Sequence, residues 1–422
     1  MNLSMQQIAV LIAAIIHSAS TLVEARFKPT SFTRNRKMPF ETVLRFMLEN
    51  AKLSTQTALN RFMRKIGRES IEVEKTISQQ AFSEARNKFD HSPFEKMFRA
   101  MVKEDYSKDE LIGRYSGYKV FAIDGSTYAL PNLKTLKEEF GVSGSGKDSA
   151  TARSSLLYDM VNDRIIDAAI APYSVGERDL AMGHISRIPE VCEKTDDVLL
   201  IFDRGYASID LMRFIESQPH KMSFLMRVRR KWNVDVDNAP LGSSFVEIEG
   251  IRLRVIKFIL PSDEIETLVT NLYDMDDDLF PDLYYMRWPI EVKYDIIKNK
   301  LCIEYFSGYT ANAIRQDFWI AMTLANIAAI AKTEADAKIK SDRKDKPNKW
   351  EYQANVNNLI ASVKDRFAEA VFSKSIRYRL TTVNSIINEV ARCADPIRPF
   401  RNSPRDKSIR NSKYHYNSKP NS

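Results

Sequence analysis

Three acidic residues carry the chemistry that this sequence suggests most strongly. Asp124 follows the apolar run YKVFAI and Asp203 follows VLLIF, so each is expected where a buried strand ends. Glu291 lies in WPIEVKYDIIK, a segment with helical periodicity. Two divalent metal ions about 3.5–4 Å apart need carboxylates on rigid elements to clamp the attacking and leaving oxygens of a phosphoryl transfer. Mg²⁺ takes few carboxylates and fills its shell with water and phosphate oxygens.

The segment YYMRWPIEVKYDIIK, residues 284–298, surrounds Glu291 with further polar groups. On an uninterrupted helix, four polar residues fall within about 60° of one another: Tyr284, Arg287, Glu291 and Lys298. An apolar stripe beside them is expected to be buried, formed by Ile290, Tyr294, Ile297 and Leu301. Pro289 interrupts the polar stripe. If it is the first helical residue, as proline prefers, Tyr284 and Arg287 lie in the preceding turn.

Each of these features also has an ordinary explanation. Asp124-Gly125 and Asp203-Arg204-Gly205 suit turns in which the acid hydrogen-bonds its own backbone. Arg287 and Glu291 stand at i,i+4, a spacing that stabilises a solvent-exposed helix by a few tenths of a kcal/mol. The combination therefore favours a site more strongly than any one residue does.

The elements that must position these residues predict a multi-domain α+β protein. Residues 1–110 show helical patterns, and the segments 40–67 and 76–89 suit either a helix-turn-helix that enters a DNA groove or a small bundle. Strands and helices alternate over 115–335, with a hairpin expected at Asn162-Asp163. Residues 336–396 again have helical patterns, and the polar, basic end 397–422 is expected to be disordered.

Charge and cysteine content narrow the classes of partner and compartment. The 422 residues carry a net charge of +8, which suits a polyanionic partner. Basic residues are densest in 398–422, with seven Lys/Arg against one acid. The three cysteines are far apart in the sequence, which argues against zinc and against a disulfide framework and favours the cytoplasm. The apolar stretch 8–16 is too short to span a bilayer, so we expect a buried helix face and no membrane association.

In this order the motifs resemble those of bacterial DDE transposases. DGS at 124–126, DRGY at 203–206 and Tyr-x2-Arg-x3-Glu-x6-Lys at 284–298 are similar to the three signatures of one insertion-sequence branch, the IS-four family, known by its last motif, YREK. The resemblance extends over about residues 30–420. It implies an RNase H-like mixed sheet with a β-rich insertion, about 224–275, between the second Asp and the Glu.

The resemblance also implies roles for individual residues. Asp124, Asp203 and Glu291 would bind two Mg²⁺ ions, or Mn²⁺ in their place. The phosphates of the transposon end would face Tyr284, Arg287 and Lys298, since Arg offers a bidentate fork and Lys a point charge. Two further candidates for DNA contact are Arg204 and Trp232. Trp232 would stack on a flipped base, although packing is the commoner role of a lone tryptophan.

The implied function is cut-and-paste DNA transposition in the cytoplasm, at the nucleoid. The N-terminal helices would bind terminal inverted repeats, and the metal site would cleave the strand and join the freed 3′-OH to target DNA. Synapsis of two ends implies at least a homodimer. Two alternatives stay open: an inactive or domesticated DNA-binding derivative, and a related metal-dependent DNA nuclease that cuts without joining.

Overall fold

The computed structural model describes residues 3–34, 37–49, 54–70, 76–107, 112–143, 149–347 and 349–398. The basic tail expected at 397–422 therefore lies outside the described residues from 399 onward. The chain divides into two compact units, one of Leu3–Met101 with Ile297–Ser422 and one of Val102–Ile296. The N-terminal and C-terminal helices thus belong to the same compact unit. The functional division into 1–110, 115–335 and 336–396 stays a prediction.

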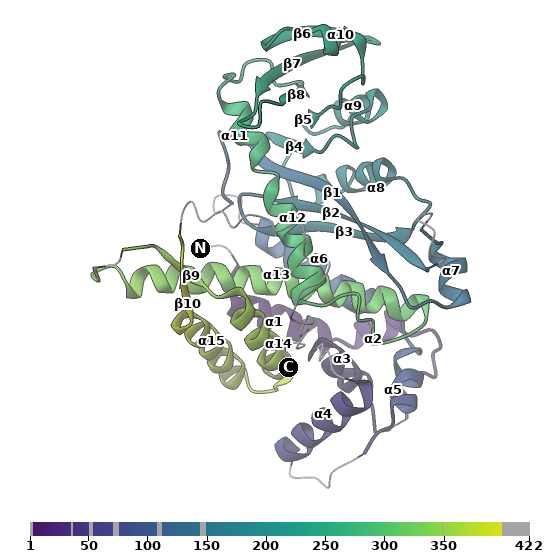
Figure 1. The fold of residues 1–422 in the computed structure, drawn as a ribbon. Helices are drawn as coiled ribbons and strands as arrows, with labels where there is room; N and C mark the ends of the chain where they lie inside the picture. The colour runs from purple at the N-terminus through teal and green to yellow at the C-terminus, as the bar shows by residue number, and fades with distance from the viewer. Residues whose placement is uncertain are drawn as a thin grey trace, which may run out of the picture. The chain divides into compact units, whose positions relative to one another are not determined.

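The unit Val102–Ile296 is built on one mixed sheet in the order β3-β2-β1-β4-β5-β8-β7-β6 (Figure 1). The strands are β1 Lys119–Ala129, β2 Thr151–Asp159, β3 Arg164–Pro172, β4 Val198–Phe202, β5 Met222–Arg227, β6 Gly242–Ile248, β7 Ile251–Ile259 and β8 Ile265–Thr270. β1 is antiparallel to β2 and parallel to β4, and β4 is parallel to β5. The first five strands thus have the order and directions of an RNase H-like core, which confirms the predicted fold class.

Local sequence explains the main features of this sheet. Every residue of β4 is buried, as the uninterrupted apolar run VLLIF predicts for a central parallel strand. The hairpin between β2 and β3 turns at residues 160–163, where Asp163 adopts a φ of 55°. Asn and Asp tolerate this left-handed region better than bulky residues do, so the Asn162-Asp163 prediction is confirmed.

Helices cover the sheet and connect its strands. They are α7 Lys134–Phe140, α8 Glu177–Ile185, α9 Ile209–Glu216, α10 Val234–Asn238, α11 Leu279–Tyr285 and α12 Trp288–Asp295. α8 packs on β1, β2 and β3, and α9 packs on β5. The buried His184 of α8 hydrogen-bonds Asp167 of β3 at 2.8 Å, which fixes α8 to the sheet.

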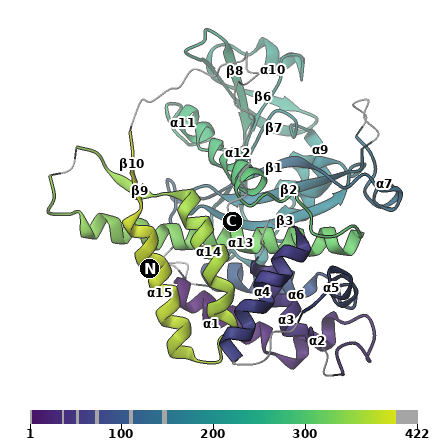
Figure 2. The same ribbon diagram turned by 60° about the horizontal axis from the view of Figure 1, so that its bottom comes forward.

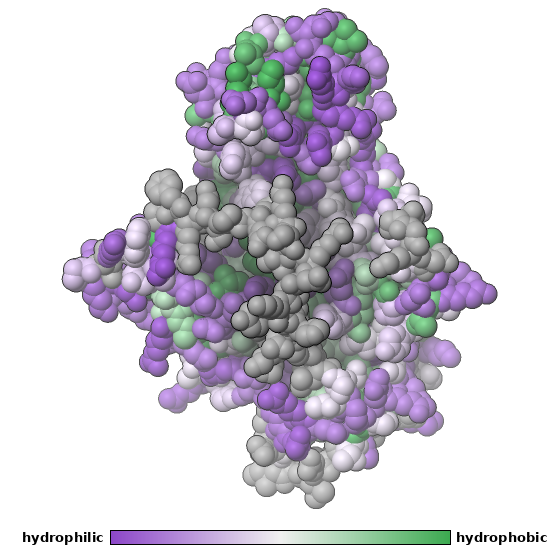
Figure 3. Space-filling view, viewed as in Figure 1, coloured by the Kyte–Doolittle hydropathy of each residue, from purple (hydrophilic) through white to green (hydrophobic). Residues whose placement is uncertain are grey.

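The predicted β-rich insertion is an extension of the core sheet. β8 pairs antiparallel with the core strand β5, and β7 and β6 follow outward from it. Several large apolar side chains are exposed on these strands and beside them, including Leu241, Phe245 and Ile259. Figure 3 shows apolar surface at this end of the unit.

The unit of the chain ends is helical. Its helices are α1 Met5–Ile16, α2 Ala19–Ala25, α3 Phe40–Glu49, α4 Thr55–Ser70, α5 Gln79–Arg86, most of α6 Ser92–Tyr106, α13 Ala311–Asp342, α14 Val356–Phe372 and α15 Ile376–Arg392. A short pair, β9 Tyr352–Ala354 and β10 Ala394–Pro396, links the C-terminal segments. α14 and α15 pack together and against α13, as Figure 2 shows.

α1 belongs to the core of this helical unit. Most of its apolar side chains, among them Ile8 and Ile12, are buried, and the helix packs on α14 and α15. The prediction of a buried N-terminal helix face is thereby confirmed. Among the described residues no single helix has the length and apolar composition to cross a membrane, and α1 and α2 meet those criteria only as a pair bent by 60°.

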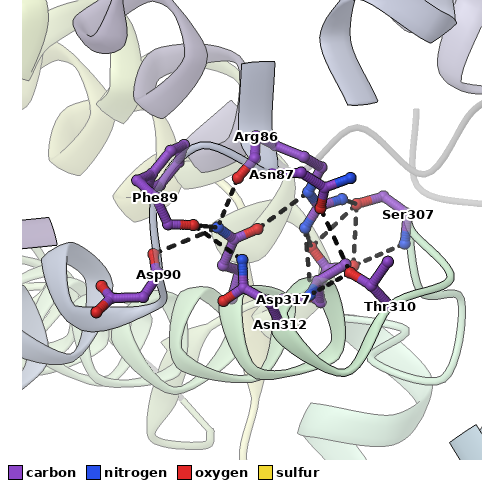
Figure 4. A network of polar contacts seen from close by, with 10 residues as sticks. Arg86, Asn87, Phe89, Asp90, Ser307, Thr310, Asn312 and Asp317 are labelled. Carbon is purple, nitrogen blue, oxygen red and sulfur yellow. Dashed lines mark hydrogen bonds and ion pairs between the residues drawn. The ribbon is translucent and has the colours of Figure 1, made fainter. Parts of the chain in front are cut away.

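Arg86, at the end of α5, is buried within the helical unit (Figure 4). Its guanidinium donates to Gln316, Ser307, the Ala313 carbonyl and the Asp317 carboxylate. The Asp317 contact is 3.0 Å long. The interpretation of 76–89 as a basic helix entering a DNA groove therefore does not hold for Arg86, because α13 and the loop before it take up its donors.

Candidate active site

The strand register brings the two aspartates together. The last pair between the parallel strands β1 and β4 is Ile123 with Phe202, so an aspartate follows the paired residue in both segments: Asp124 within β1 and Asp203 directly after β4. Neighbouring strands are about 4.8 Å apart, which makes the two carboxylates neighbours. The sequence suggested that β1 ends at Asp124, and this prediction was wrong. It continues to Ala129 because residues 124–129 keep pairing with β2.

The segment that carries Glu291 is broken, unlike the single helix that the polar stripe assumed. α11 ends at Tyr285 and α12 begins at Trp288, with Pro289 in its first turn. Tyr284 is therefore in α11, Arg287 is in the connecting turn, and Glu291 is in the first turn of α12. Proline prefers this position because it has no N–H to leave unbonded there. Lys298 lies in the π-helical turn Ile296–Lys300 that follows α12.

α12 is fixed against the sheet by its other side. The buried Lys293 donates to Asp163 in the β2–β3 turn at 2.6 Å, and the Tyr294 hydroxyl donates to the Asp124 carbonyl at 2.8 Å. The whole predicted apolar stripe is buried, which confirms it: Ile290, Tyr294, Ile297 and Leu301. These contacts hold the Glu291 backbone beside β1.

Arg287 joins the carboxylates of the site. Its Nη1 lies 3.3 Å from Asp124 Oδ2, and its Nη2 lies 2.5 Å from Glu291 Oε1. The Tyr284 hydroxyl donates to Asp203 Oδ1 at 3.3 Å. The structure thus brings together five of the residues that the sequence singled out, three acids with one cation and one hydroxyl.

The electrostatics of the site disfavour its negative charge. Burial, together with the Asp203 and Glu291 carboxylates, raises the pKa of Asp124 to about 6, although Arg287 and the Gly125 N–H oppose the shift. Burial and the Asp203 carboxylate also raise the pKa of Tyr284, which therefore remains a hydroxyl donor at neutral pH. One guanidinium does not balance three carboxylates, and additional positive charge would stabilise this cluster.

These residues suit divalent metal ions by their chemistry. The three acids offer oxygen donors only, which hard ions such as Mg²⁺ and Mn²⁺ prefer. Within the described residues, no three acidic, histidine or cysteine side chains are close enough together to hold a metal ion as they stand. Arg287 contacts Asp124 and Glu291 at this point and supplies part of the positive charge that the cluster needs.

The raised pKa predicts how the stability of the metal-free protein depends on pH. The pKa of Asp124 is about 6 in the folded chain against an ordinary 3.8. The contribution of the Asp124 carboxyl group to the unfolding free energy is therefore fully present below about pH 4. It is lost as the pH rises through 6, because the folded chain then has to bury a charged carboxylate. Relative to Asp124→Asn, the wild type should lose about 2–3 kcal/mol of unfolding free energy over this range. Urea titrations in EDTA at several pH values measure the difference, and a constant gap would contradict the shifted pKa.

A fourth carboxylate lies near the site. A Cβ on Gly125 would stand 3.2 Å from the Glu177 side chain, and one on Gly205 would stand 4.0 Å from it. Glu177 accepts from Arg153 of β2 at 2.6 Å. From the sequence, ERDLAMGH indicated a helix whose Glu177 and His184 either support the site or face solvent. The glycines of DGS and DRGY were the available signal for this close approach.

The two weaker DNA-contact candidates are both associated with the loop that follows Asp203. Arg204 follows Asp203 directly and is exposed. Trp232 is half-buried, and its indole N–H donates to the carbonyl of Ala207 at 3.3 Å, in the loop that follows Asp203. This bond connects the start of the insertion to that loop. The role of Trp232 in stacking on a base stays a prediction.

Comparisons with known proteins show the family of this chain. The family described as Transposase DDE domain matches residues 115–327, half of the chain. The chain belongs to this family. It is also similar to the putative transposase InsZ of Escherichia coli (strain K12), with 24% identity over 183 residues that cover 42% of this chain and 58% of that relative. Among solved structures, the piggyBac transposase in its synaptic complex with hairpin DNA shares 12% identity and a TM-score of 0.48, covering 95% of this chain and 88% of that one.

Proposed function

We propose that this protein is a DNA transposase of the YREK branch that cleaves transposon ends and joins them to target DNA by metal-dependent phosphoryl transfer. The observation that carries the proposal is the contact of Arg287 with both Asp124 and Glu291, beside a register that makes Asp203 the neighbour of Asp124. Membership of the DDE family implies polynucleotidyl transfer, and that family generally uses divalent metal.

In this proposal each residue has a distinct task. Asp124, Asp203 and Glu291 would hold two Mg²⁺ ions, or Mn²⁺, which supply Lewis acidity at the attacking and leaving oxygens when bound. A phosphate at these carboxylates is within reach of the Arg287 fork and of the Tyr284 hydroxyl. Lys298 would add a point charge that contacts the DNA backbone. Arg204 and Trp232 would contact DNA at the rim.

The wider assembly follows from the chemistry. A water molecule would attack the strand at the transposon end, and the 3′-OH released by that cleavage would attack target DNA. The N-terminal helices would recognise the terminal inverted repeats, with Arg86 excluded from base contact by its burial. Two ends must be cut and joined together, so we propose at least a homodimer in the active complex.

Cleavage of the natural ends tests this function. Purified protein is incubated with Mg²⁺ and labelled duplexes that carry the two ends flanking its gene, in parallel with Glu291→Ala. We expect cutting at one defined phosphodiester on each end, joining of the 3′-ends to target DNA, and loss of both in the variant. Gel shifts on the same duplexes should show that Glu291→Ala retains binding.

Other outcomes point to the alternatives. Specific binding without cutting by the wild type would indicate an inactive or domesticated DNA-binding derivative. Cutting without joining, or without preference for the ends, would indicate a nuclease. Cutting that survives in Glu291→Ala would contradict the assignment of this residue to the metal site.

A further inference from the structure

A cationic surface lies in the helical unit, at the C-terminal end of α13. A cavity of about 800 Å³ is formed by the end of this helix, the segment after it and β9. We call it the cationic groove and define it by six of its lining residues: Lys340, Arg343, Lys344, Lys349, Trp350 and Tyr352. Figure 3 shows hydrophilic surface at this end of α13.

The groove has more positive than negative charge. Its lining contains five cations, since Lys332 joins the four already named, against two carboxylates, Asp336 and Glu351. Asp336 is occupied by Lys332 at 2.6 Å and by the Ala354 N–H. Within the described residues, Lys340, Lys344 and Lys349 form no ion pair. Lys340 is in the last turn of α13 and Lys344 follows the end of that helix, so like charges gather there, and a bound anion would reduce their repulsion.

Two aromatic rings stand among these cations. The Arg343 guanidinium lies 3.7 Å from the centre of the Tyr352 ring, and the Lys349 ammonium lies 5.4 Å from that of Trp350. Both rings are half-buried and line the groove. Cations interleaved with flat aromatic surfaces are the usual composition of surfaces that follow a nucleic-acid backbone.

Ordinary explanations account for part of this arrangement. α13 ends at Asp342, and the negative end of its dipole favours Lys340 and Lys344. That effect fades within one turn, so it does not explain Lys349 or the aromatic rings. The chain's own basic end, 398–422, has the same sign of charge and would be repelled. An anionic partner with repeated charges meets the requirements that remain.

We propose that the cationic groove binds the phosphate backbone of duplex DNA without reading its sequence. Three lysines without carboxylate partners match about three successive phosphates. The identity of the duplex as transposon or target DNA rests on the proposed function, whereas the binding itself does not. The groove would thus hold DNA outside the carboxylate site and contribute affinity that falls with salt.

Salt dependence tests the groove directly. The full chain is titrated onto a fluorescent duplex of random sequence at several KCl concentrations, in EDTA so that no cleavage occurs. The triple variant Lys340→Ala/Lys344→Ala/Lys349→Ala should bind about 100-fold more weakly near 0.1 M salt, with a slope of log K against log salt reduced by about 3. A matched variant, Lys134→Ala/Lys194→Ala/Lys221→Ala, removes equal charge from exposed positions outside both the groove and the N-terminal helices, and it should keep the wild-type slope.

Further variants keep the result interpretable. Lys→Arg at the three groove positions retains the charge and should restore the slope, whereas equal losses in the groove and matched variants would overturn the proposal. A wild-type slope in the groove variant, with thermal melting unchanged, would overturn it as well. Cutting of the natural ends is measured separately at saturating protein. If the wild type does not cut but the groove variant has the expected lower salt slope, the proposed function is wrong and the DNA-binding role of the groove is supported.

Discussion

Replacing Asp124 with asparagine is expected to abolish metal-dependent strand cleavage while leaving the metal-free protein at least as stable as the wild type at neutral pH. The activity should fall by about a thousandfold or more, because Lewis-acid stabilisation contributes several kcal/mol. Stability should not fall, because burial and two neighbouring carboxylates already disfavour the charge of Asp124, and raise its pKa to about 6. Asparagine keeps the shape and retains an oxygen for Arg287, 3.3 Å from Asp124 in the wild type.

Paired measurements separate this result from unfolding. Thermal melting in EDTA should give a midpoint for Asp124→Asn equal to or above that of the wild type. Adding Mg²⁺ or Mn²⁺ should raise the melting temperature of the wild type and leave that of the variant unchanged, since binding to the folded state alone stabilises it. An inactive variant that melts well below the wild type would contradict this account, and so would a variant that still responds fully to metal.

Replacing Arg86 with alanine should produce a large loss of stability in the helical unit. The substitution removes four hydrogen-bond partnerships and leaves the Asp317 carboxylate, whose side chain is 10% exposed, without its guanidinium. Breaking a buried ion pair from one side costs about 3–5 kcal/mol, because the remaining charge is left desolvated. Urea denaturation followed by circular dichroism measures the change in unfolding free energy.

A second substitution tests the cause of that loss. Asp317→Asn removes the charge that would be stranded, so Arg86→Ala should cost less in the Asp317→Asn background than in the wild type. Lys88→Ala is the matched control. Lys88 is only partly buried and lies 5.9 Å from the ring of Phe32, so its loss should change stability by less than about 1 kcal/mol. Similar losses for Arg86→Ala and Lys88→Ala would contradict the burial of Arg86.

Short sequence patterns were sufficient to predict those elements whose structure depends on neighbouring residues alone. VLLIF reads as a central strand because both of its faces are buried, and Asn162-Asp163 reads as a turn because those residues tolerate unusual backbone angles. The apolar spacing of Ile290 and Tyr294 was enough to predict which side of α12 is buried. Pro289 was the local signal for the break before α12, and it outweighed the polar stripe that a single helix would have formed.

What the sequence alone determined is the types and order of the site residues: two acids after apolar runs, then an arginine, a glutamate and a proline in fixed spacing. Only the tertiary structure decided which of them meet. Whether Asp124 lies beside Asp203 depends on the register of β1 with β4, and pairing partners remote in sequence leave no local signal. The burial of Arg86 also depends on tertiary structure, because most of its partners are in α13, more than 200 residues later in the sequence. A basic residue near an apolar stripe looks the same in sequence whether it contacts DNA or a carboxylate, and only the burial of its surroundings distinguishes the two.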